Sequence, residues 1–243
     1  MQKLLLMFIC ALSTVGLQAQ EIDKPLASFN KIVVSPKINL ILTQGDTEHI
    51  RLVYANITPD KINIDVDGRT LRLFLDDARI YENTKRSHHA SREGIYRDVV
   101  ITACVTYKAI RALEIRGDQE LICNGELNSR QFTLKAYGEN EIRLSSVSST
   151  YFKTSLYGAN DLKINGGQVK NQQYRLFGEN KIDTRALHAI NTTATLYGES
   201  RIKLTTTDEL KVNSFGEGLV YYQGDAIVSK GFIFGRPQIA RLN

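Results

Sequence analysis

The chain has 243 residues, of which 42% are hydrophobic and 23% charged, and its formal net charge is +5 at pH 7. These proportions are typical of a folded globular protein and exclude a disordered chain, and the small positive charge gives no reason to expect a nucleic-acid partner. The 17 glycines exclude a collagen-like chain, and no apolar run reaches the roughly 18–20 residues of a membrane span, so we expect none in the mature chain.

Residues 1–20 are predicted to form a secretory signal peptide. Lys3 gives a basic start, a largely apolar run follows, and Ala19 is the small residue that a signal peptidase prefers. We expect cleavage after Ala19 or Gln20, which leaves a net charge of +4. A buried N-terminal helix and lipidation at Cys10 are the alternatives, but no helical partner follows and the residues before Cys10 are not small. The protein is therefore predicted to be exported to the periplasm, the outer surface or the extracellular space.

Residues 21–110 are predicted to form an N-terminal β section that is continuous with the repeats that follow it. Asp67-Gly68 is a strong hairpin signal, and Gly45-Asp46 separates two further strands. We expect an irregular, partly antiparallel section whose strands continue into the repeats or cap them. The segments that alternate between apolar and polar residues are 29–34, 38–44, 49–54, 62–66 and 71–75.

The polar stretch from Asp76 to Asp98 is predicted to be a solvated loop. It contains the densest basic cluster, residues 85–92, which we interpret as loop surface rather than as a binding patch. His88 and His89 are adjacent in this cluster, and adjacent side chains of an extended chain point in opposite directions. We therefore expect no metal site there.

Two cysteines, Cys104 and Cys123, remain after the predicted cleavage. Export permits a disulfide. In the strand expected at 98–106, the more apolar alternate positions include Ile101 and Val105, which places Cys104 on the opposite face, whereas Cys123 is predicted to point inward. Side chains on opposite faces of a sheet cannot bridge without backbone movement, so we expect no disulfide.

Residues 111–243 are predicted to form a β-solenoid with a C-terminal cap. Glycine recurs there with spacings of 21, 20, 20, 20 and 18 residues, and from the second copy on it follows Tyr or Phe. A period of about 20 residues is too short for helical pairs or propeller blades, and it is the length of one solenoid turn. The recurring glycines are Gly117, Gly138, Gly158, Gly178, Gly198 and Gly216.

Apolar residues hold constant positions relative to these glycines, and charged residues alternate with them. Such alternation predicts strands, and coils stacked about 4.8 Å apart would bury the apolar columns while pairing the backbone. The position four residues after glycine holds Leu121, Ile142, Leu162, Ile182, Ile202 and Val220. The residues expected to face water are Glu141, Arg143, Asp161, Lys163, Lys181, Asp183, Arg201 and Lys203.

The motif around each glycine predicts a corner of the coil, since glycine adopts positive φ at low steric cost. We expect the preceding aromatic residues to stack as a ladder, worth about 0.5–1.5 kcal/mol per pair. Asn140, Asn160 and Asn180 are expected to form a second ladder. We interpret the aromatic column as structural, with a sugar-stacking surface as the alternative. Its members are Tyr137, Tyr157, Phe177 and Tyr197.

Several short motifs occur in an order that resembles a known family. They follow the signal peptide at residues 29–34, 37–39, 44–46 and 68–71, continue through the glycine repeats, and end at 218–225. This order resembles the head GIN domain of auto-transporter adhesins, secreted proteins found mostly in Bacteroidetes, over nearly all of residues 26–240. The resemblance implies a right-handed parallel β-helix and an adhesin-like role, and it carries no catalytic residues. Lys37 stands where the family's name motif usually has Gly.

Motifs for a zinc site, a phosphate loop, a dinucleotide fold or a nucleophile elbow are not present in the sequence, so no cofactor or metal is expected. One pair resembles a catalytic constellation: Glu179 and Glu199 would lie one coil apart, about 5 Å, near the carboxyl separation of retaining glycosidases. We interpret these glutamates as surface decoration, because Lys181 and Arg201 follow closely and no evident cleft would raise one pKa.

The sequence therefore predicts a single-domain, secreted, all-β protein that binds rather than catalyses. Its partner is predicted to be a glycan or a surface protein, reached by outward columns that repeat on every coil so that weak contacts add up. A nucleic-acid partner is not expected. The alternatives are a polysaccharide-active β-helix enzyme and a structural envelope protein that self-associates, and the oligomeric state is left open.

Overall fold

The computed structural model describes residues 19–86 and 92–242, which form strands and one short 3-10 helix, η1 (Pro59–Lys61). All strands except β7 and β8 belong to one mixed sheet. The strands are, in chain order, β1 (Gln20–Pro25), β2 (Lys31–Val34), β3 (Ile38–Gln44), β4 (His49–Ala55), β5 (Ile62–Asp67), β6 (Thr70–Leu75), β7 (Thr84–Arg86), β8 (Arg92–Gly94), β9 (Val100–Tyr107), β10 (Ala112–Gly117), β11 (Glu120–Gly138), β12 (Glu141–Gly158), β13 (Asp161–Ile164), β14 (Gly167–Gly178), β15 (Lys181–Tyr197), β16 (Arg201–Gly216), β17 (Leu219–Gln223), β18 (Ile227–Gly235) and β19 (Gln238–Arg241).

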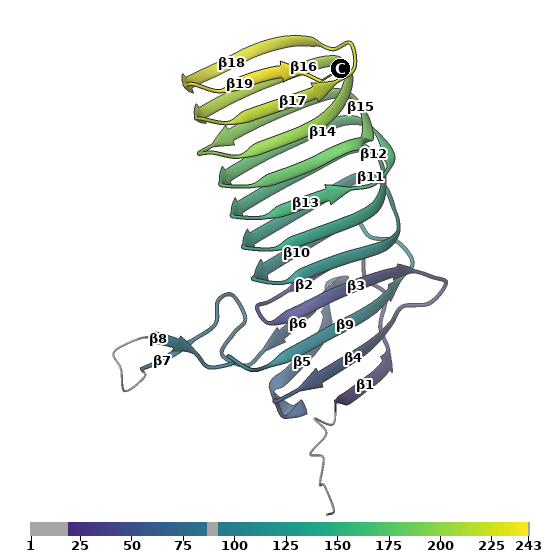
Figure 1. The fold of residues 1–243 in the computed structure, drawn as a ribbon. Coiled ribbons are helices and arrows are strands. Elements are labelled where there is room, and N and C mark those ends of the chain that lie inside the picture. The colour runs from purple at the N-terminus through teal and green to yellow at the C-terminus, as the bar shows by residue number, and fades with distance from the viewer. Residues whose placement is uncertain (1–18, 87–91, 243) are drawn as a thin grey trace, which may run out of the picture.

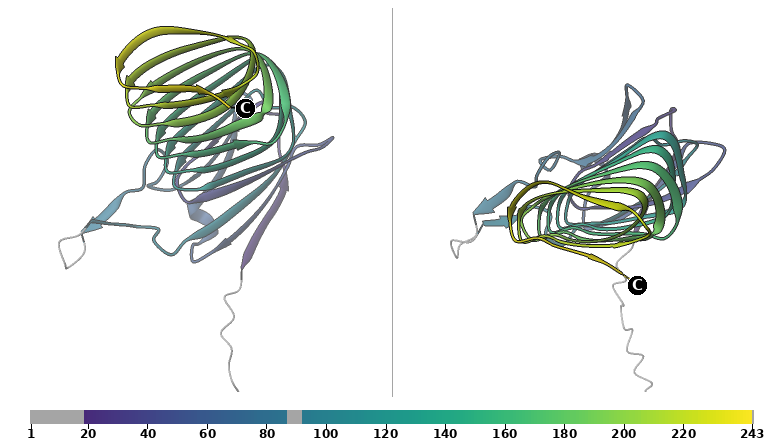
Figure 2. Two further views of the ribbon diagram at one scale, coloured as in Figure 1. Left: turned by 45° about the horizontal axis from the view of Figure 1, so that its top comes forward. Right: turned by 90° about the horizontal axis from the view of Figure 1, so that it is seen from above.

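Strands β10 to β19 form a parallel β-solenoid, as the glycine spacing predicts (Figure 1). Successive coils pair in register, so that Leu121 lies opposite Ile142 and Ile142 lies opposite Leu162. β12 pairs with β13 through residues 141–144 and with β14 through residues 147–158, because it bends round a corner of the coil. Seen along the stack, the coils follow one another as flattened loops of similar outline (Figure 2).

The inward columns fill the solenoid with apolar side chains. Ile142 and Leu162 are fully buried and Ile182 nearly so, which confirms the parity expected from the sequence. Thr184 occupies a position that is apolar in most coils, and its Oγ1 lies 2.9 Å from the hydroxyl of Tyr174. Burial of apolar surface stabilises by about 25 cal/mol per Å², so these columns hold the stack together. Thr184 is paired, whereas Ser214, a buried polar residue opposite Leu196, has no partner for its Oγ atom.

The N-terminal strands stack in an order that differs from their order in the chain. β2 pairs in parallel with β6 and β10, and β3 pairs in parallel with β9 and β11. The coil formed by residues 31–44 therefore has two neighbours in the stack. On one side lies the coil of β6 and β9, which comes later in the chain, and on the other side lies the first glycine repeat, formed by β10 and β11. β4 is antiparallel to β1 and β9. The hairpin predicted at Asp67-Gly68 is confirmed, with β5 antiparallel to β6 and positive φ at Gly68 and Arg69.

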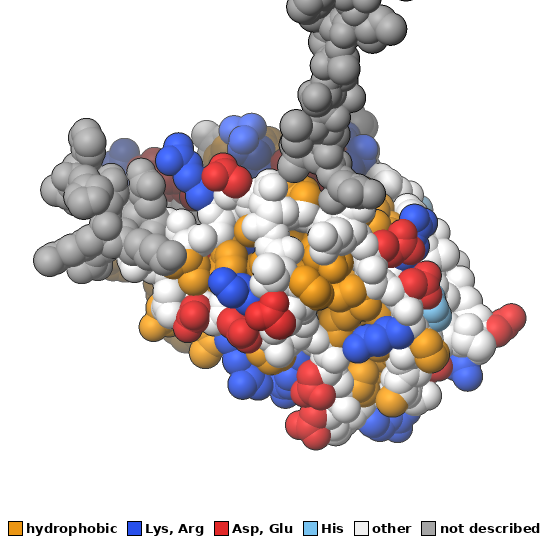
Figure 3. Space-filling view, turned by 90° about the horizontal axis from the view of Figure 1, so that it is seen from below, with side chains coloured by type: hydrophobic (Ala, Val, Ile, Leu, Met, Phe, Trp, Pro, Cys, Tyr) orange, Lys and Arg blue, Asp and Glu red, His pale blue; other side chains and the backbone are white. Residues whose placement is uncertain are grey.

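Hydrophobic side chains are exposed at both ends of the stack. At the lower end, in the view from below, hydrophobic side chains gather in a central band between charged ones (Figure 3). At the upper end, β18 and β19 pair in parallel with β16 and β17, so the segment expected to cap the solenoid extends it by one more coil. Ile227, Phe232 and Phe234 on this last coil are more than three-quarters exposed.

The two cysteines of the described chain are free. Cys123 is buried, with its Sγ 3.5 Å from the hydroxyl of Tyr107, and burial raises the pKa of its thiol. Cys104 is half-buried and alternates along β9 with the buried Ile101 and Val105. The opposite faces expected for the two cysteines are therefore confirmed, and the raised pKa makes Cys123 a poor nucleophile.

Some expectations fall on segments outside the described residues. The predicted signal peptide lies outside them except for Ala19 and Gln20, and His88 and His89 lie outside them too. On either side of these two histidines, β7 and β8 pair as an antiparallel hairpin. In residues 19–86 and 92–242, no helix is both long and apolar enough to cross a membrane.

Candidate binding surface

The corner at each repeat glycine, called here the glycine corner, is built from backbone geometry. Gly138 and Gly158 have φ of +108° and +110°, which residues with a Cβ rarely adopt. The N–H of Ala159 donates to the Gly138 carbonyl oxygen at 3.0 Å, and the N–H of Glu139 donates to Gly117 at 2.9 Å. A Cβ on Gly158 would lie 2.2 Å from the Gly138 oxygen. Any side chain at these positions would break the contact between coils.

An aromatic column stands beside the glycine corner. Ring centroids are 4.9 Å apart for Tyr137 and Tyr157, 4.6 Å for Tyr157 and Phe177, and 4.5 Å for Phe177 and Tyr197, with planes within 6° of parallel. Phe215 continues the column, 4.8 Å from Tyr197. Each inner ring therefore has both faces covered by neighbouring rings and presents its edge to water. A sugar stacks on a free ring face, and the inner rings offer none, so this geometry favours the structural role that we expect for the column over the alternative of a sugar-stacking surface.

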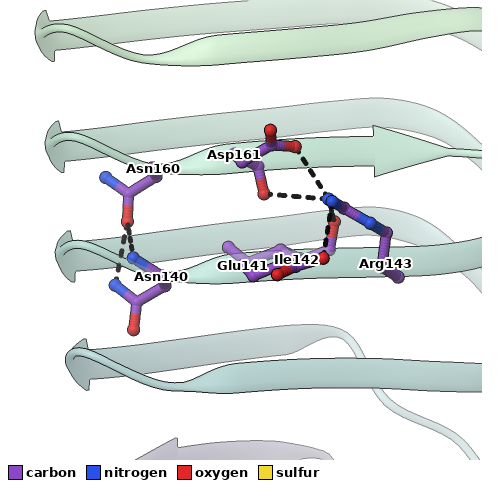
Figure 4. Close-up of polar contacts among 6 residues, drawn as sticks. All are labelled: Asn140, Glu141, Ile142, Arg143, Asn160 and Asp161. Carbon is purple, nitrogen blue, oxygen red and sulfur yellow. Dashed lines mark hydrogen bonds and ion pairs between the residues drawn. The ribbon is translucent and has the colours of Figure 1, made fainter.

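A ladder of buried amide side chains runs alongside the aromatic column (Figure 4). The Nδ2 atom of Asn140 donates to Oδ1 of Asn160 at 2.8 Å, and Nδ2 of Asn160 donates to Oδ1 of Asn180 at 2.9 Å. The asparagine ladder expected from the sequence is confirmed. Gln119 and Ser200 extend it at its two ends, which sequence reasoning missed although both stand two residues after a repeat glycine.

Outward columns beyond the corner carry alternating charges. Arg143 lies 2.7 Å from a carboxylate oxygen of Glu141 and 2.8 Å from one of Asp161 on the next coil (Figure 4). Asp183 accepts two hydrogen bonds from the guanidinium of Arg185, which lower the pKa of that carboxyl although partial burial opposes them. These pairs are partly exposed and contribute little stability, but they fix a charged pattern on the outer wall.

The two carboxylates weighed above as a catalytic pair, Glu179 and Glu199, are both exposed at the glycine corner. They border a shallow hollow of about 390 Å³ together with Lys181, Arg201 and Glu217. A carboxylic general acid needs a setting that raises its pKa, such as an apolar pocket, and this hollow is open and mixed in charge. Within the described chain, no group of three His, Cys, Asp or Glu side chains is placed to hold a metal ion.

A second groove lies at the opposite corner of the coils, and sequence reasoning missed it. It has a volume of about 460 Å³, and we call it the serine groove. Polar triplets recur there, at residues 128–130 and 148–150, and could have signalled it. The residues that matter for its chemistry are Ser129, Arg130, Ser149, Gln168, Lys170 and His188.

Comparison with protein families gives one match. The family model described as "Putative auto-transporter adhesin, head GIN domain" matches residues 28–226, which is most of the chain. No curated protein matches the sequence.

Solved structures share the fold. A putative adhesin from Bacteroides fragilis has a TM-score of 0.72 at 18% identity, and one from Parabacteroides merdae has 0.65 at 16%. A protein from Parabacteroides distasonis named as a putative lipid binding protein has 0.68 at 14%. Each alignment covers 93% of this chain and 97% of the other. At these identities the similarity establishes the fold alone.

Proposed function

The chain belongs to the family of putative auto-transporter adhesins with a head GIN domain, and we propose that it is an exported, non-catalytic protein that binds a glycan or a surface protein. The observation that carries this proposal is the in-register repetition of the outer wall. Side chains four coils apart stand in the same column, as for Tyr137 and Phe215 at the two ends of the stacked rings. A rigid surface with such a repeat suits a partner that is itself repetitive, because weak contacts add along the axis.

A non-catalytic role agrees with the setting of the two glutamates. Glu179 and Glu199 are exposed and share their hollow with Lys181 and Arg201. Catalysis by such a pair requires one carboxyl to keep its proton near neutral pH. We therefore assign these residues to the charged surface.

The experiment uses the mature chain, residues 20–243 or 21–243, labelled and applied to a glycan array and to arrayed envelope proteins, with phospholipid vesicles as a third arm. Saturable binding to a glycan or a protein supports the proposal. The same chain is incubated with a polysaccharide panel and assayed for new reducing ends, beside the double variant Glu179→Gln, Glu199→Gln. Release of reducing ends that the double variant abolishes would establish a glycosidase and overturn the proposal, as would saturable binding to vesicles alone.

Self-association is a second candidate role, favoured by the last coil. β18 pairs with β16 along one edge, no strand of the described chain is paired in register with its other edge, and the strand carries the exposed side chains of Ile227, Phe232 and Phe234. An exposed strand edge with apolar side chains pairs readily with another chain. Light scattering of the mature chain tests this role: a dimer that Phe232→Lys converts to a monomer supports it, and a monomer at all concentrations contradicts it.

A further inference from the structure

The serine groove lies where the regular pairing of the coils is interrupted. The register between β15 and β16 shifts between Thr184 and His188 and again between Ala189 and Asn191, beside lining residues of the groove. The register between β11 and β12 shifts between Cys123 and Glu126, just before the first lining residue, Asn128. These irregularities occur at the corner that carries no repeat glycine. The groove of about 460 Å³ crosses β11, β12, β14 and β15 and reaches Thr207 on β16, so it runs along the axis of the stack.

Its charge is of one sign. Arg130 and Lys170 are exposed and occupy the same column two coils apart, which corresponds to about 9.6 Å. His188 adds a third basic side chain. Among the described residues that line the groove, none is Asp or Glu. The hollow at the glycine corner is different, because Glu179 and Glu199 line it beside their cationic neighbours.

Its floor carries hydroxyl groups that the fold does not use. The Oγ atoms of Ser129 and Ser149 are buried and have no hydrogen-bond partner within the protein. In the next two coils the same column holds Val169 and Ala189, both buried. Packing at this position is thus satisfied by apolar side chains, and an unpaired buried hydroxyl is unfavourable unless something pairs with it. Thr154 and Ser214, which do not line the groove, also have buried hydroxyls without a partner. The two serine hydroxyls therefore support a polar ligand only together with the cations of the groove.

We propose that the serine groove binds a linear acidic polysaccharide, lying along the stack axis with its anionic groups on Arg130 and Lys170. This proposal rests on the proposed function and specifies its ligand. The sugar hydroxyls would pair with the amides and hydroxyls that line the groove, such as Gln168 and Thr150. Of the described residues that line it, none is aromatic, which disfavours a single-stranded nucleic acid, since such ligands stack their bases on aromatic rings. Its single exposed large apolar residue, Ile190, offers an acidic peptide little anchorage.

The test measures binding of oligogalacturonate and of chondroitin sulfate to the mature chain by calorimetry, with neutral dextran as the comparison ligand. The variant is Arg130→Gln, Lys170→Gln. The matched control is Lys163→Gln, Lys203→Gln, which also removes two cations two coils apart, but from the outer wall beyond the glycine corner. We expect the groove variant to bind at least about tenfold more weakly and the control to stay within about twofold. Thermal melts establish that both variants are folded.

Equal losses of polysaccharide affinity in both variants would mean that binding depends only on the net charge of the protein. That result would overturn the assignment to this groove. Saturable binding of an acidic peptide but of neither polysaccharide would overturn the ligand class. Binding of other glycans or proteins with no effect of the groove variant would refute this inference while leaving the proposed function intact. As a second readout, Gln168→Leu removes an exposed amide from the groove without changing charge, and we expect it to weaken polysaccharide binding about threefold or more.

Discussion

The two corners of each coil are built in different ways. At the glycine corner, the same backbone contact recurs on each coil, with Gly158 held against Gly138, and aromatic and amide ladders continue it in register. At the corner of the serine groove, register shifts interrupt the pairing, and one column changes from Ser149 to Val169 to Ala189. Where the backbone of the neighbouring coil leaves no room for a side chain, every coil needs glycine at the same position. The corner beside the serine groove carries that constraint on some coils only, as at Gly167, where a Cβ would lie 2.1 Å from the Val147 oxygen. Its other side chains vary from coil to coil and are available for recognition.

Substitution of a corner glycine is expected to have the largest effect. In Gly158→Ala the added Cβ lies 2.2 Å from the Gly138 carbonyl oxygen at φ +110°, and we expect a loss of about 3 kcal/mol or more, from backbone strain and the contact together. Gly166→Ala, on the groove side, meets only a Ser145 oxygen at 3.5 Å and should change stability by less than about 1 kcal/mol. Urea unfolding measures both. Similar midpoints for the two variants would erase the distinction between the corners.

Removal of an amide from the asparagine ladder is expected to cause the second-largest loss of stability. Asn160→Ala leaves the amide of Asn140 without its acceptor in a buried site, and we expect a loss of about 2 kcal/mol in the free energy of unfolding. Asn128→Ala removes an exposed amide at the opposite corner and should stay within about 0.5 kcal/mol. Denaturant titration of the pair measures the difference. A stability of Asn160→Ala equal to that of the unchanged protein would show that water replaces the ladder.

A substitution in the aromatic column should lower the stability of the protein less than the two changes above. Phe177→Leu keeps an apolar side chain but removes two ring contacts, with Tyr157 and with Tyr197, and we expect a loss of about 1–2 kcal/mol. Ile190→Leu, half-exposed beside the serine groove, serves as the control and should change stability by less than about 0.5 kcal/mol. Thermal melting compares the two. An unchanged melting temperature for Phe177→Leu would mean that the column contributes no more than its buried area.

Glu114, on β10 three residues before Gly117, is expected to make the stability of the fold depend on pH. Burial alone would raise the pKa of Glu114, but hydrogen bonds from Arg116 at 3.0 and 2.5 Å and the ammonium of Lys31 at 3.5 Å hold this pKa below its usual value. A lowered pKa stabilises the fold above the unfolded value of about 4.3, and this stabilisation is lost as the pH falls through the lower folded value. Glu114→Gln should therefore cost about 1 kcal/mol at pH 7 and flatten the acid limb of the stability curve. If the free energy of unfolding changes with pH in the same way for Glu114→Gln and the unchanged protein down to pH 3, Glu114 does not cause the acid dependence.

The smallest expected effect has the opposite sign. Ser149→Ala removes a buried hydroxyl that has no partner, and we expect the protein to gain up to about 1 kcal/mol of stability. Ser148→Ala changes the neighbouring half-buried serine and should be neutral within about 0.5 kcal/mol. The free energies of unfolding from urea titration give the sign directly. A loss on Ser149→Ala would show that this hydroxyl is already paired in solution and would weaken the argument for a ligand at the groove.

The sequence by itself determined the solenoid and its regular corner. The 20-residue period and the alternation of apolar and polar residues were sufficient, because a stack of equal coils imposes the same burial on each copy. Gly138, Asn160 and Phe177 could be assigned to a corner because backbone geometry and ladder contacts dictate their residue types. The hairpin at Asp67-Gly68 was equally predictable, because its turn requires positive φ at the central residues.

Only the tertiary structure decided the pairing order of the first strands and the site of the second groove. Alternation specifies which side chains face inward, but it does not name the strand that lies alongside, so the insertion of residues 31–44 between β6 and β9 on one side and the first repeat on the other could not be read from it. The serine groove is lined by residues of five strands, β11, β12, β14, β15 and β16, and it includes a register shift next to Ala189, so it exists only once the coils are stacked. Arg130 and Lys170 are forty residues apart in the chain, and stacking alone places them in one column.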